Sequence, residues 1–157
     1  QTILRQYLIS SFQCLQYQAL GKSNDETLAA LAIKSLKEVT YHRRHSADWV
    51  IRLGQGTEES ARRMRDAIDE LWMFTDDLFL TNEVDSTLKS SGTGISAGDL
   101  RAAWDKEVDA VLHEAGLQRP EKSYSVKGGI EGKHTEHLGH ILAEMQSLHR
   151  AIPGAKW

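Results

Sequence analysis

The sequence predicts an all-α protein made of about five helices. Apolar residues recur with the 3.6-residue period of a helix along most of the 157 residues, and no segment sustains the period-two alternation of strands. The composition, with 40% hydrophobic and 26% charged residues, is ordinary for a folded domain, and a chain of this length can bury a substantial core. We therefore expect a helical bundle that forms one domain over residues 1–157.

The first two predicted helices cover residues 2–20 and 23–53. The first ends at Gly21, because glycine commonly stops a helix. In the second, Ser23 and Glu26 have the spacing of a capping box, and the helix is about 40 Å long, as in long helical bundles. Its expected inner stripe is Leu28, Leu31, Ala32, Ser35, Val39, His42, Ser46, Trp49, Val50 and Leu53.

Three further helices complete the predicted bundle. The third covers residues 57–79, a loop rich in Ser and Gly covers residues 81–98, and the fourth helix ends at Ala115. The connection that follows contains a run over residues 124–129 that we interpret as a short hairpin. The last helix, residues 135–151, has an apolar stripe that we expect to be buried. Its expected core residues are Leu138, Ile141, Leu142, Met145, Leu148 and His149, and Trp49, Trp72 and Trp104 are expected core residues of the earlier helices.

Charge and cysteine content limit the classes of function. Nineteen Lys and Arg against 22 Asp and Glu leave a net charge of −3, which gives no reason to expect nucleic acid or membrane as a partner. Cys14 is the single cysteine, so no internal disulfide can form and a reducing, cytoplasmic location is expected. The chain begins at Gln1 directly in helical rhythm, so we expect an N-terminally truncated fragment whose bundle lacks its first helices.

The most informative motif lies in the middle of the second helix, from Glu38 to His42. Di-iron carboxylate bundles bind metal through Glu-x-x-His, because a step of three residues places both side chains on one inward face. Here Tyr41 occupies the third position after Glu38, and the histidine arrives one residue later. The motif therefore predicts a ferritin-like helix that has kept its scaffold and lost its metal site.

Two interpretations of this cluster stay open. A metal half-site would use Glu38 with His42 or His45, whereas a buried polar cluster would let the carboxylate satisfy Tyr41 and the histidines by hydrogen bonds. A bridged di-iron site needs one Glu from each of two helices and two Glu-x-x-His pairs, and this set cannot be assembled here. We favour the structural interpretation, with no catalytic residue and no cofactor in this chain. The alternative is a self-sufficient di-metal oxidase that uses Glu38, His42 and Glu144.

Two other patterns are weaker. Steps of three residues on one helix spread His134, His137 and His140 over about 120°, so all three cannot bind one metal ion from that helix. Cys14 has no base three or four residues away, and no Gly-x-Ser-x-Gly elbow exists, so nucleophilic catalysis has little support.

Six runs of the sequence carry a family resemblance: residues 34–42, 49–58, 67–79, 100–104, 134–139 and 142–146. These runs resemble the C-subunit family of bacterial phenylacetyl-CoA epoxidases. The resemblance covers essentially the whole chain, which is similar to the C-terminal two-thirds of that family's members.

The resemblance implies a ferritin-like component of a multicomponent monooxygenase in aerobic phenylacetate breakdown. In such systems the di-iron centre lies in a homologous catalytic subunit, and the member of the C-subunit family pairs with it as a non-catalytic structural partner. The resemblance therefore implies a hetero-oligomer with that di-iron catalytic subunit, and no metal in this chain. The altered motif at Glu38 and Tyr41, interpreted independently, agrees with this division of labour.

Exposed charged faces are the expected contacts with the catalytic partner. Opposite charges across such an interface set register and specificity more than affinity. The candidates are Asp66, Glu70, Arg43 and Arg44, with Arg62, Arg63 and Asp77 on the same faces.

Overall fold

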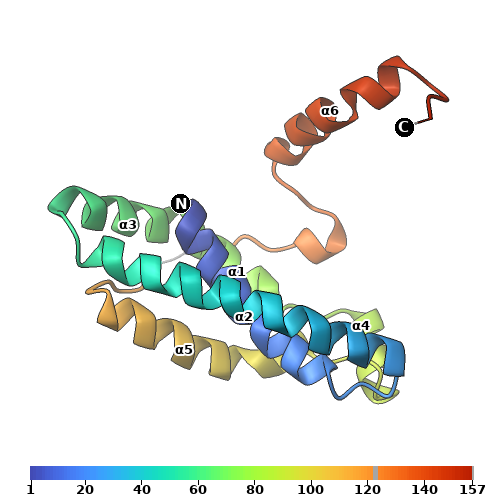
Figure 1. Cartoon of the computed structure of the whole chain (residues 1–157), viewed down its shortest axis with the longest axis horizontal. Helices are drawn as coiled ribbons and strands as arrows, with labels where there is room; N and C mark the ends of the chain where they lie inside the picture. Colours follow the sequence, from blue (N-terminus) through green and yellow to red (C-terminus); the bar gives the residue numbers. More distant parts are fainter. Residues whose placement is uncertain (122–123, 157) are drawn as a thin grey trace. The chain divides into compact units, whose positions relative to one another are not determined.

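The structure, a computed structural model, describes residues 1–121 and 124–156 (Figure 1). It divides into two compact units, Gln1–Val126 and Lys127–Trp157, and each is described here by itself. The described residues form six α-helices and three 3-10 helices, without a strand. The all-α prediction is confirmed, and the prediction that residues 1–157 form one domain stays a prediction.

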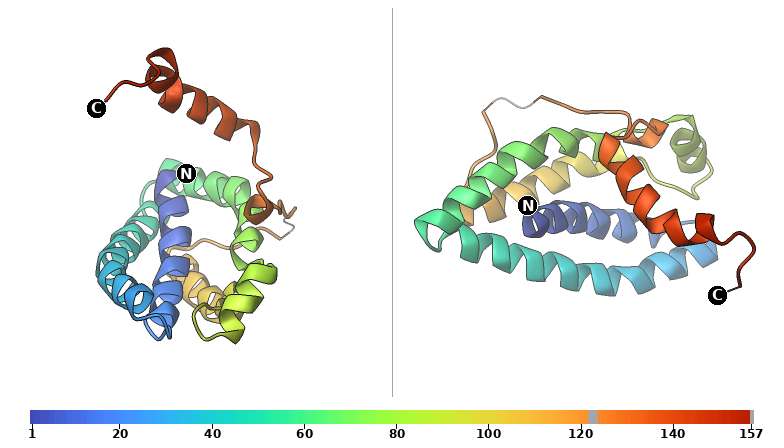
Figure 2. Two further views of the ribbon diagram at one scale, coloured as in Figure 1. Left: turned by 90° about the vertical axis from the view of Figure 1, so that its right-hand side faces the viewer. Right: turned by 90° about the horizontal axis from the view of Figure 1, so that it is seen from above.

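Two long antiparallel helices, α1 (Thr2–Leu20) and α2 (Glu26–Gly54), form the base of the first unit. They lie side by side in both views of Figure 2. The side chain of Asp25 caps α2, because its carboxylate accepts a hydrogen bond from the amide of Leu28 at 2.9 Å. The predicted cap, Ser23, instead donates its hydroxyl to the carbonyl of Thr93 at 2.6 Å.

The third predicted helix is divided between two helix types. The α-helix α3 spans Glu58–Leu71, and the 3-10 helix η1 continues from Trp72 to Phe79. The prediction of one α-helix over residues 57–79 is therefore wrong over its last eight residues. Eight residues make a long 3-10 segment, because this tighter winding rarely exceeds three or four residues.

The predicted loop over residues 81–98 contains a short helix, α4 (Glu83–Ser90). It begins with a capping box in which Asn82 accepts from the amide of Asp85, and the carboxylate of Asp85 accepts from the amide of Asn82, both at 3.0 Å. A 3-10 turn, η2 (Ala97–Leu100), leads into α5 (Arg101–Glu114), which packs against both α1 and α2.

The core of the first unit is centred on Trp104, which is 0% exposed. Its indole Nε1 donates a hydrogen bond to the carbonyl of Leu8 at 3.0 Å, so its polar atom is satisfied. Phe79 packs edge-on against Trp104 at 5.2 Å between ring centroids, and Trp72 lies 6.0 Å away. The expected burial of Trp72 and Trp104 is confirmed. The other buried core residues include Leu4, Tyr7, Phe12, Val50, Met64, Ile68, Val108 and Leu112.

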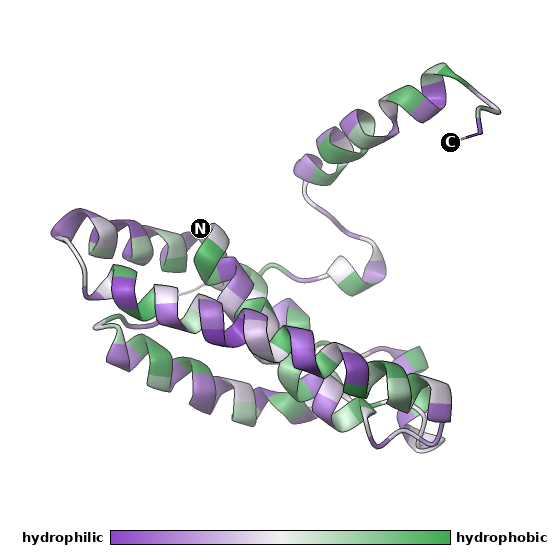
Figure 3. Ribbon diagram, in the orientation of Figure 1, coloured by the Kyte–Doolittle hydropathy of each residue, from purple (hydrophilic) through white to green (hydrophobic). Residues whose placement is uncertain are grey.

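The second unit holds a 3-10 turn, η3 (Gly129–Glu131), and the helix α6 (Glu136–Ala151). The expected hairpin over residues 124–129 is not formed, and Gly128 and Gly132 instead adopt left-handed backbone with φ of 116° and 81° around η3. Hydrophobic positions recur along α6 in Figure 3, as its sequence predicts.

The stripe of α6 is exposed, contrary to the expectation of a buried face. Met145 is 75% exposed, and His149 is exposed rather than a core histidine. The physical reason is that the described residues of the second unit form no other α-helix that could cover α6, and an apolar stripe needs a larger surface to cover it. The other exposed apolar residues of the stripe are Ile141, Leu142 and Leu148.

Candidate functional site

The altered metal motif lies on the exposed side of α2. Glu38, Tyr41, His42 and His45 are not buried, so the expected position of His42 inside the core is wrong. The rings of Tyr41 and His45 stack at 5.9 Å with an interplanar angle of 19°. The buried polar cluster that the sequence suggested is therefore replaced by a solvent-facing row of rings one turn apart.

Trp49 extends this row and corrects a second expectation. It is 40% exposed rather than buried, with its ring 6.5 Å from that of His45 and the guanidinium of Arg52 5.6 Å from its centroid. The side of α2 that α1 and α5 cover is narrower than the predicted stripe and is marked by Val39 and Val50. We define the exposed row Tyr41, His45 and Trp49 as the α2 aromatic row.

The metal-ligand chemistry of the described residues is limited. Residues 1–121 and 124–156 contain no group of three or more His, Cys, Asp or Glu side chains placed to hold a metal ion. Glu38 and His42 belong to the first unit, whereas Glu144, the third residue of the alternative oxidase site, belongs to the second. His134, His137 and His140 have exposed side chains at the start of the second unit's helix.

A polar contact that joins helices lies further along α2, at Arg43. Arg43 of α2 forms an ion pair with Glu107 of α5, with Nη1 and Oε2 3.0 Å apart and both side chains about a third exposed or less. The hydroxyl of Tyr7 donates to the carbonyl oxygen of Glu107 at 3.3 Å, which brings α1 into the same cluster. Three helices thus meet at Arg43, Glu107 and Tyr7, a polar cluster that the sequence interpretation did not identify.

Burial raises the pKa of two side chains of α1, Tyr7 and Cys14. Desolvation raises the pKa of the Tyr7 phenol far above its usual value, although Arg43 opposes the shift. Burial also raises the pKa of the Cys14 thiol, whose sulfur lies 4.0 Å from the hydroxyl of Thr40. A thiol kept protonated in this way is a poor nucleophile, which agrees with the sequence interpretation of Cys14. In the sequence, Glu107 lies one residue before the inward Val108, at the border of the apolar stripe of this helix. This position was the one feature of the sequence that could have suggested an ion pair with a neighbouring helix.

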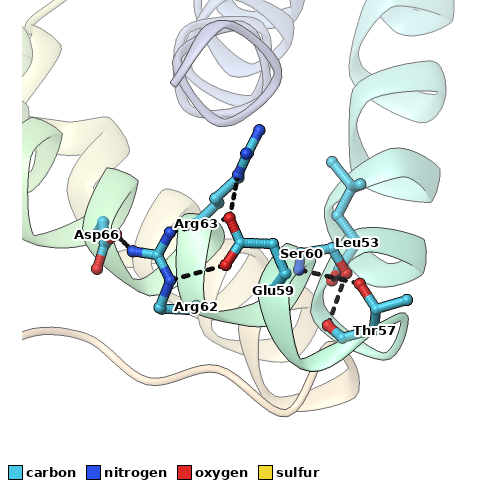
Figure 4. Close-up of polar contacts among 7 residues, drawn as sticks. All are labelled: Leu53, Thr57, Glu59, Ser60, Arg62, Arg63 and Asp66. Carbon is cyan, nitrogen blue, oxygen red and sulfur yellow. Dashed lines mark hydrogen bonds and ion pairs between the residues drawn. The ribbon is translucent and has the colours of Figure 1, made fainter.

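The expected partner-contact residues have several partners within the chain. On α3, Arg62 bridges Glu59 at 2.9 Å and Asp66 at 2.6 Å, and Arg63 also contacts Glu59 at 2.7 Å (Figure 4). These hydrogen bonds from Arg62 and Arg63 lower the pKa of Glu59 to about 2. The positive charges on this face are therefore largely matched within the helix itself.

The other three candidates differ in their surroundings. Glu70 accepts a hydrogen bond from the side-chain amide of Gln1. Arg43 is held by Glu107, whereas Arg44 is exposed. An interface that used Asp66 or Arg43 would therefore have to compete with an existing ion pair, whereas Arg44 takes part in no ion pair formed among residues 1–121 and 124–156.

Two arginines, Arg101 and Arg119, contact rings of the aromatic core. Arg101 contacts Asp76 at 2.7 Å and Asp105 at 3.0 Å, and its guanidinium lies 4.8 Å from the ring centroid of Phe79. Burial alone would lower the pKa of Arg101, but the hydrogen bonds with the two carboxylates raise it above its ordinary value. Arg119 covers Trp72 at 5.0 Å in the same way. These contacts join α5 and the segment after it to the aromatic core.

The fold and the α2 motif together define a class of protein: a helical bundle that carries an incomplete carboxylate–histidine pattern. The chain belongs to the family of phenylacetic acid catabolic proteins, a ferritin-like family that its sequence matches over residues 1–157. The described residues contain no helix that is both long enough and apolar enough to cross a membrane.

A curated relative agrees with the resemblance seen in the sequence. The chain is 45% identical over 156 residues to the C subunit of the 1,2-phenylacetyl-CoA epoxidase of Escherichia coli (strain K12). The alignment covers 99% of this chain and 63% of that protein. The predicted resemblance to the C-subunit family is therefore confirmed, and the chain spans less than two-thirds of the relative's length.

Proposed function

We propose that this chain acts as the C subunit of a phenylacetyl-CoA epoxidase and braces a homologous di-iron catalytic subunit without carrying out the chemistry itself. Its setting is then the aerobic breakdown of phenylacetate in the cytoplasm. The identity of 45% to the corresponding subunit of such an enzyme supports the assignment of the complex. The proposed lack of catalytic activity depends on one observation, Tyr41 at the position where a Glu-x-x-His motif has its histidine.

A metal site depends on the side chains that converge on the ion. A di-iron centre requires several carboxylates and two imidazoles that converge on one point. On α2 the ring of Tyr41 stacks on that of His45 instead, and Glu38 is exposed beside it. A protein with this surface is useful as a rigid support for a partner, because long helices can bury a large interface with a homologue.

Copurification tests the proposal directly. The chain would be coexpressed with the di-iron catalytic subunit of a phenylacetyl-CoA epoxidase, captured by a tag and assayed for ring epoxidation and iron content. We expect a stable complex whose iron belongs to the catalytic subunit, and little iron in this chain purified alone. Stoichiometric iron in the isolated chain, together with oxidase activity, would show the self-sufficient enzyme instead.

A matched pair of variants separates bracing from chemistry. Tyr41→Phe keeps the ring of the α2 aromatic row, and Glu38→Gln keeps the side-chain shape while removing the charge. A bracing subunit should retain turnover in the complex with both variants. Loss of turnover with Glu38→Gln in an intact complex would assign a direct chemical role to that carboxylate and contradict the proposal.

A further inference from the structure

An apolar pocket of about 240 Å³ lies between α1 and η1 and includes no residue of α2. Leu8 and Thr75, both buried, form its floor, and Phe74, 41% exposed, stands at its rim. The hydroxyl of Thr75 is already used, because it donates to the carbonyl of Trp72 at 2.8 Å. The remaining lining residues are Arg5, Ile9, Leu71 and Leu78. The lining is therefore mostly hydrocarbon, and Arg5, an exposed residue, is its charged member.

The helix type changes at the residues that line this pocket. Leu71 is the last residue of α3, and Phe74, Thr75 and Leu78 belong to η1. In a 3-10 helix, side chains three residues apart eclipse one another, so Thr75 and Leu78 of η1 lie in one row. The unusually long 3-10 segment thus produces a groove, which is the kind of local irregularity that functional sites often contain.

The size of the pocket fits one aromatic ring and a short extension. A dry apolar cavity of about 150 Å³ is enough to bind benzene. A pocket of about 240 Å³ leaves room for a few further atoms beyond such a ring.

The charged residue at the pocket, Arg5, is exposed to solvent. Arg5 takes part in none of the ion pairs formed within residues 1–121 and 124–156. It is also the single charged residue of the lining. A guanidinium prefers a planar carboxylate as a partner, because its fork of N–H donors matches the two oxygens.

We propose that this pocket binds a small aromatic carboxylic acid, with the ring among Leu8, Ile9 and Leu71 and the carboxylate on Arg5. The use of phenylacetate as the first probe rests on the proposed function, whereas the ring and the single negative charge come from the pocket itself. A ligand of this size is expected to bind weakly, with a Kd of about 1 mM.

Binding would be measured by titration calorimetry and ligand-observed NMR with the 157-residue chain and phenylacetate. Arg5→Gln should weaken binding at least about tenfold, because a charge-assisted hydrogen bond is lost. Arg44→Gln, an exposed arginine outside the pocket, should leave the Kd within about twofold. 2-Phenylethylamine, which has the same ring and the opposite charge, should not bind.

A second variant leaves the charge unchanged, so it shows whether the pocket itself binds the ligand. Ile9→Phe fills the pocket and keeps Arg5, and it should abolish binding while the circular dichroism spectrum stays unchanged. Binding that survives both Arg5→Gln and Ile9→Phe, or no saturable binding up to about 20 mM, a concentration far above the expected Kd, overturns the inference.

The failure of this inference is distinguishable from the failure of the proposed function. If phenylacetate does not bind but the chain still copurifies with the catalytic subunit, only the pocket assignment is wrong. If Ile9→Phe also breaks that complex, the groove is a docking surface for a protein side chain, and the small-molecule inference is rejected.

Discussion

Arg43 on α2 and Glu107 on α5 are the residues whose charges join the two helices, with 3.0 Å between Nη1 and Oε2. Their side chains are 32% and 27% exposed, so solvent screens the pair only in part. Removing one partner should leave the other poorly solvated. We expect Arg43→Met to lower the free energy of unfolding by about 1–2 kcal/mol in urea titrations.

A double-mutant cycle checks this prediction. Arg43→Met combined with Glu107→Gln should cost less than the sum of the two single variants, because the second change removes the unpaired charge. Arg44→Met, one residue along and exposed, is the control and should change stability by less than about 0.5 kcal/mol. Strict additivity would show that the pair contributes nothing measurable.

Two glycines give a matched prediction about backbone packing. A Cβ at Gly54 would lie 2.4 Å from the carbonyl oxygen of Ala115, so Gly54→Ala must push the end of α2 away from the segment after α5. We expect a loss of about 1–3 kcal/mol. A Cβ at Gly139, inside α6, would lie in open space beside its own helix, and Gly139→Ala should raise the helix content of α6, since glycine costs about 0.5–1 kcal/mol there. Circular dichroism and urea unfolding measure both.

Glu59 gives a prediction about pH. Its pKa falls from 4.5 to about 2 in the folded chain, because Arg62 and Arg63 donate hydrogen bonds to its carboxylate. A depressed pKa contributes stability that is present above the unfolded pKa and is lost as the pH falls towards the folded pKa. The stability difference between the native chain and Glu59→Gln should therefore shrink between about pH 5 and about pH 2. The carboxylate is fully exposed, so the effect is small, and a difference that grows on acidification would contradict this account.

Glu38 is expected to contribute little to stability. A buried cluster would have made Glu38→Ala cost about 1–3 kcal/mol, because its partners would lose their hydrogen bonds. Since Glu38 is exposed, we expect a change of less than about 0.5 kcal/mol in thermal or urea unfolding. A larger loss would show that Tyr41 or His42 depends on the carboxylate after all.

The acidic side of α3 gives a prediction about assembly. Reversing the charge of Asp66 and Glu70 together, to lysine, should weaken association with the di-iron subunit and leave the fold intact. Asp66 is an exposed charge paired with Arg62, so added salt should screen it and reduce the difference in association between the variant and the native chain. The pair Glu83→Lys and Glu114→Lys, exposed acids on other helices, is the control. Normal assembly of the first double variant at physiological salt would mean that this face is only solvated.

Periodicity predicted the helices but not what covers them. The pattern correctly placed Trp72 and Trp104 in the core, because α5 and η1 have neighbours within the first unit. It failed for Trp49 and Met145, because a sequence stripe shows which residues share a face and not whether another element packs on it. The change to 3-10 winding at Trp72 leaves the apolar spacing almost unaltered and was invisible for that reason.

In the candidate site, too, features within one helix were predictable from the sequence and contacts between helices were not. The failed Glu-x-x-His step was readable from Glu38 and Tyr41, because it depends on spacing within one helix. The partnership of Arg43 with Glu107 was not, because it depends on how two residues 64 positions apart in the chain are aligned. The helix α4 could have been found from its capping box, Asn82 and Asp85, inside a segment whose composition resembles a loop.

Because Trp49 is exposed, its intrinsic fluorescence can report on binding to α2. Trp72 and Trp104 are enclosed and should be shielded from a soluble quencher such as acrylamide, whereas Trp49 faces solvent on α2. Quenching of the accessible emission in a Trp157→Phe background, with Trp49→Phe as the blank, would then measure coverage of the α2 aromatic row. A molecule that binds over the α2 aromatic row should reduce the acrylamide quenching of Trp49 and shift its emission to shorter wavelength. No attached label is needed for this measurement.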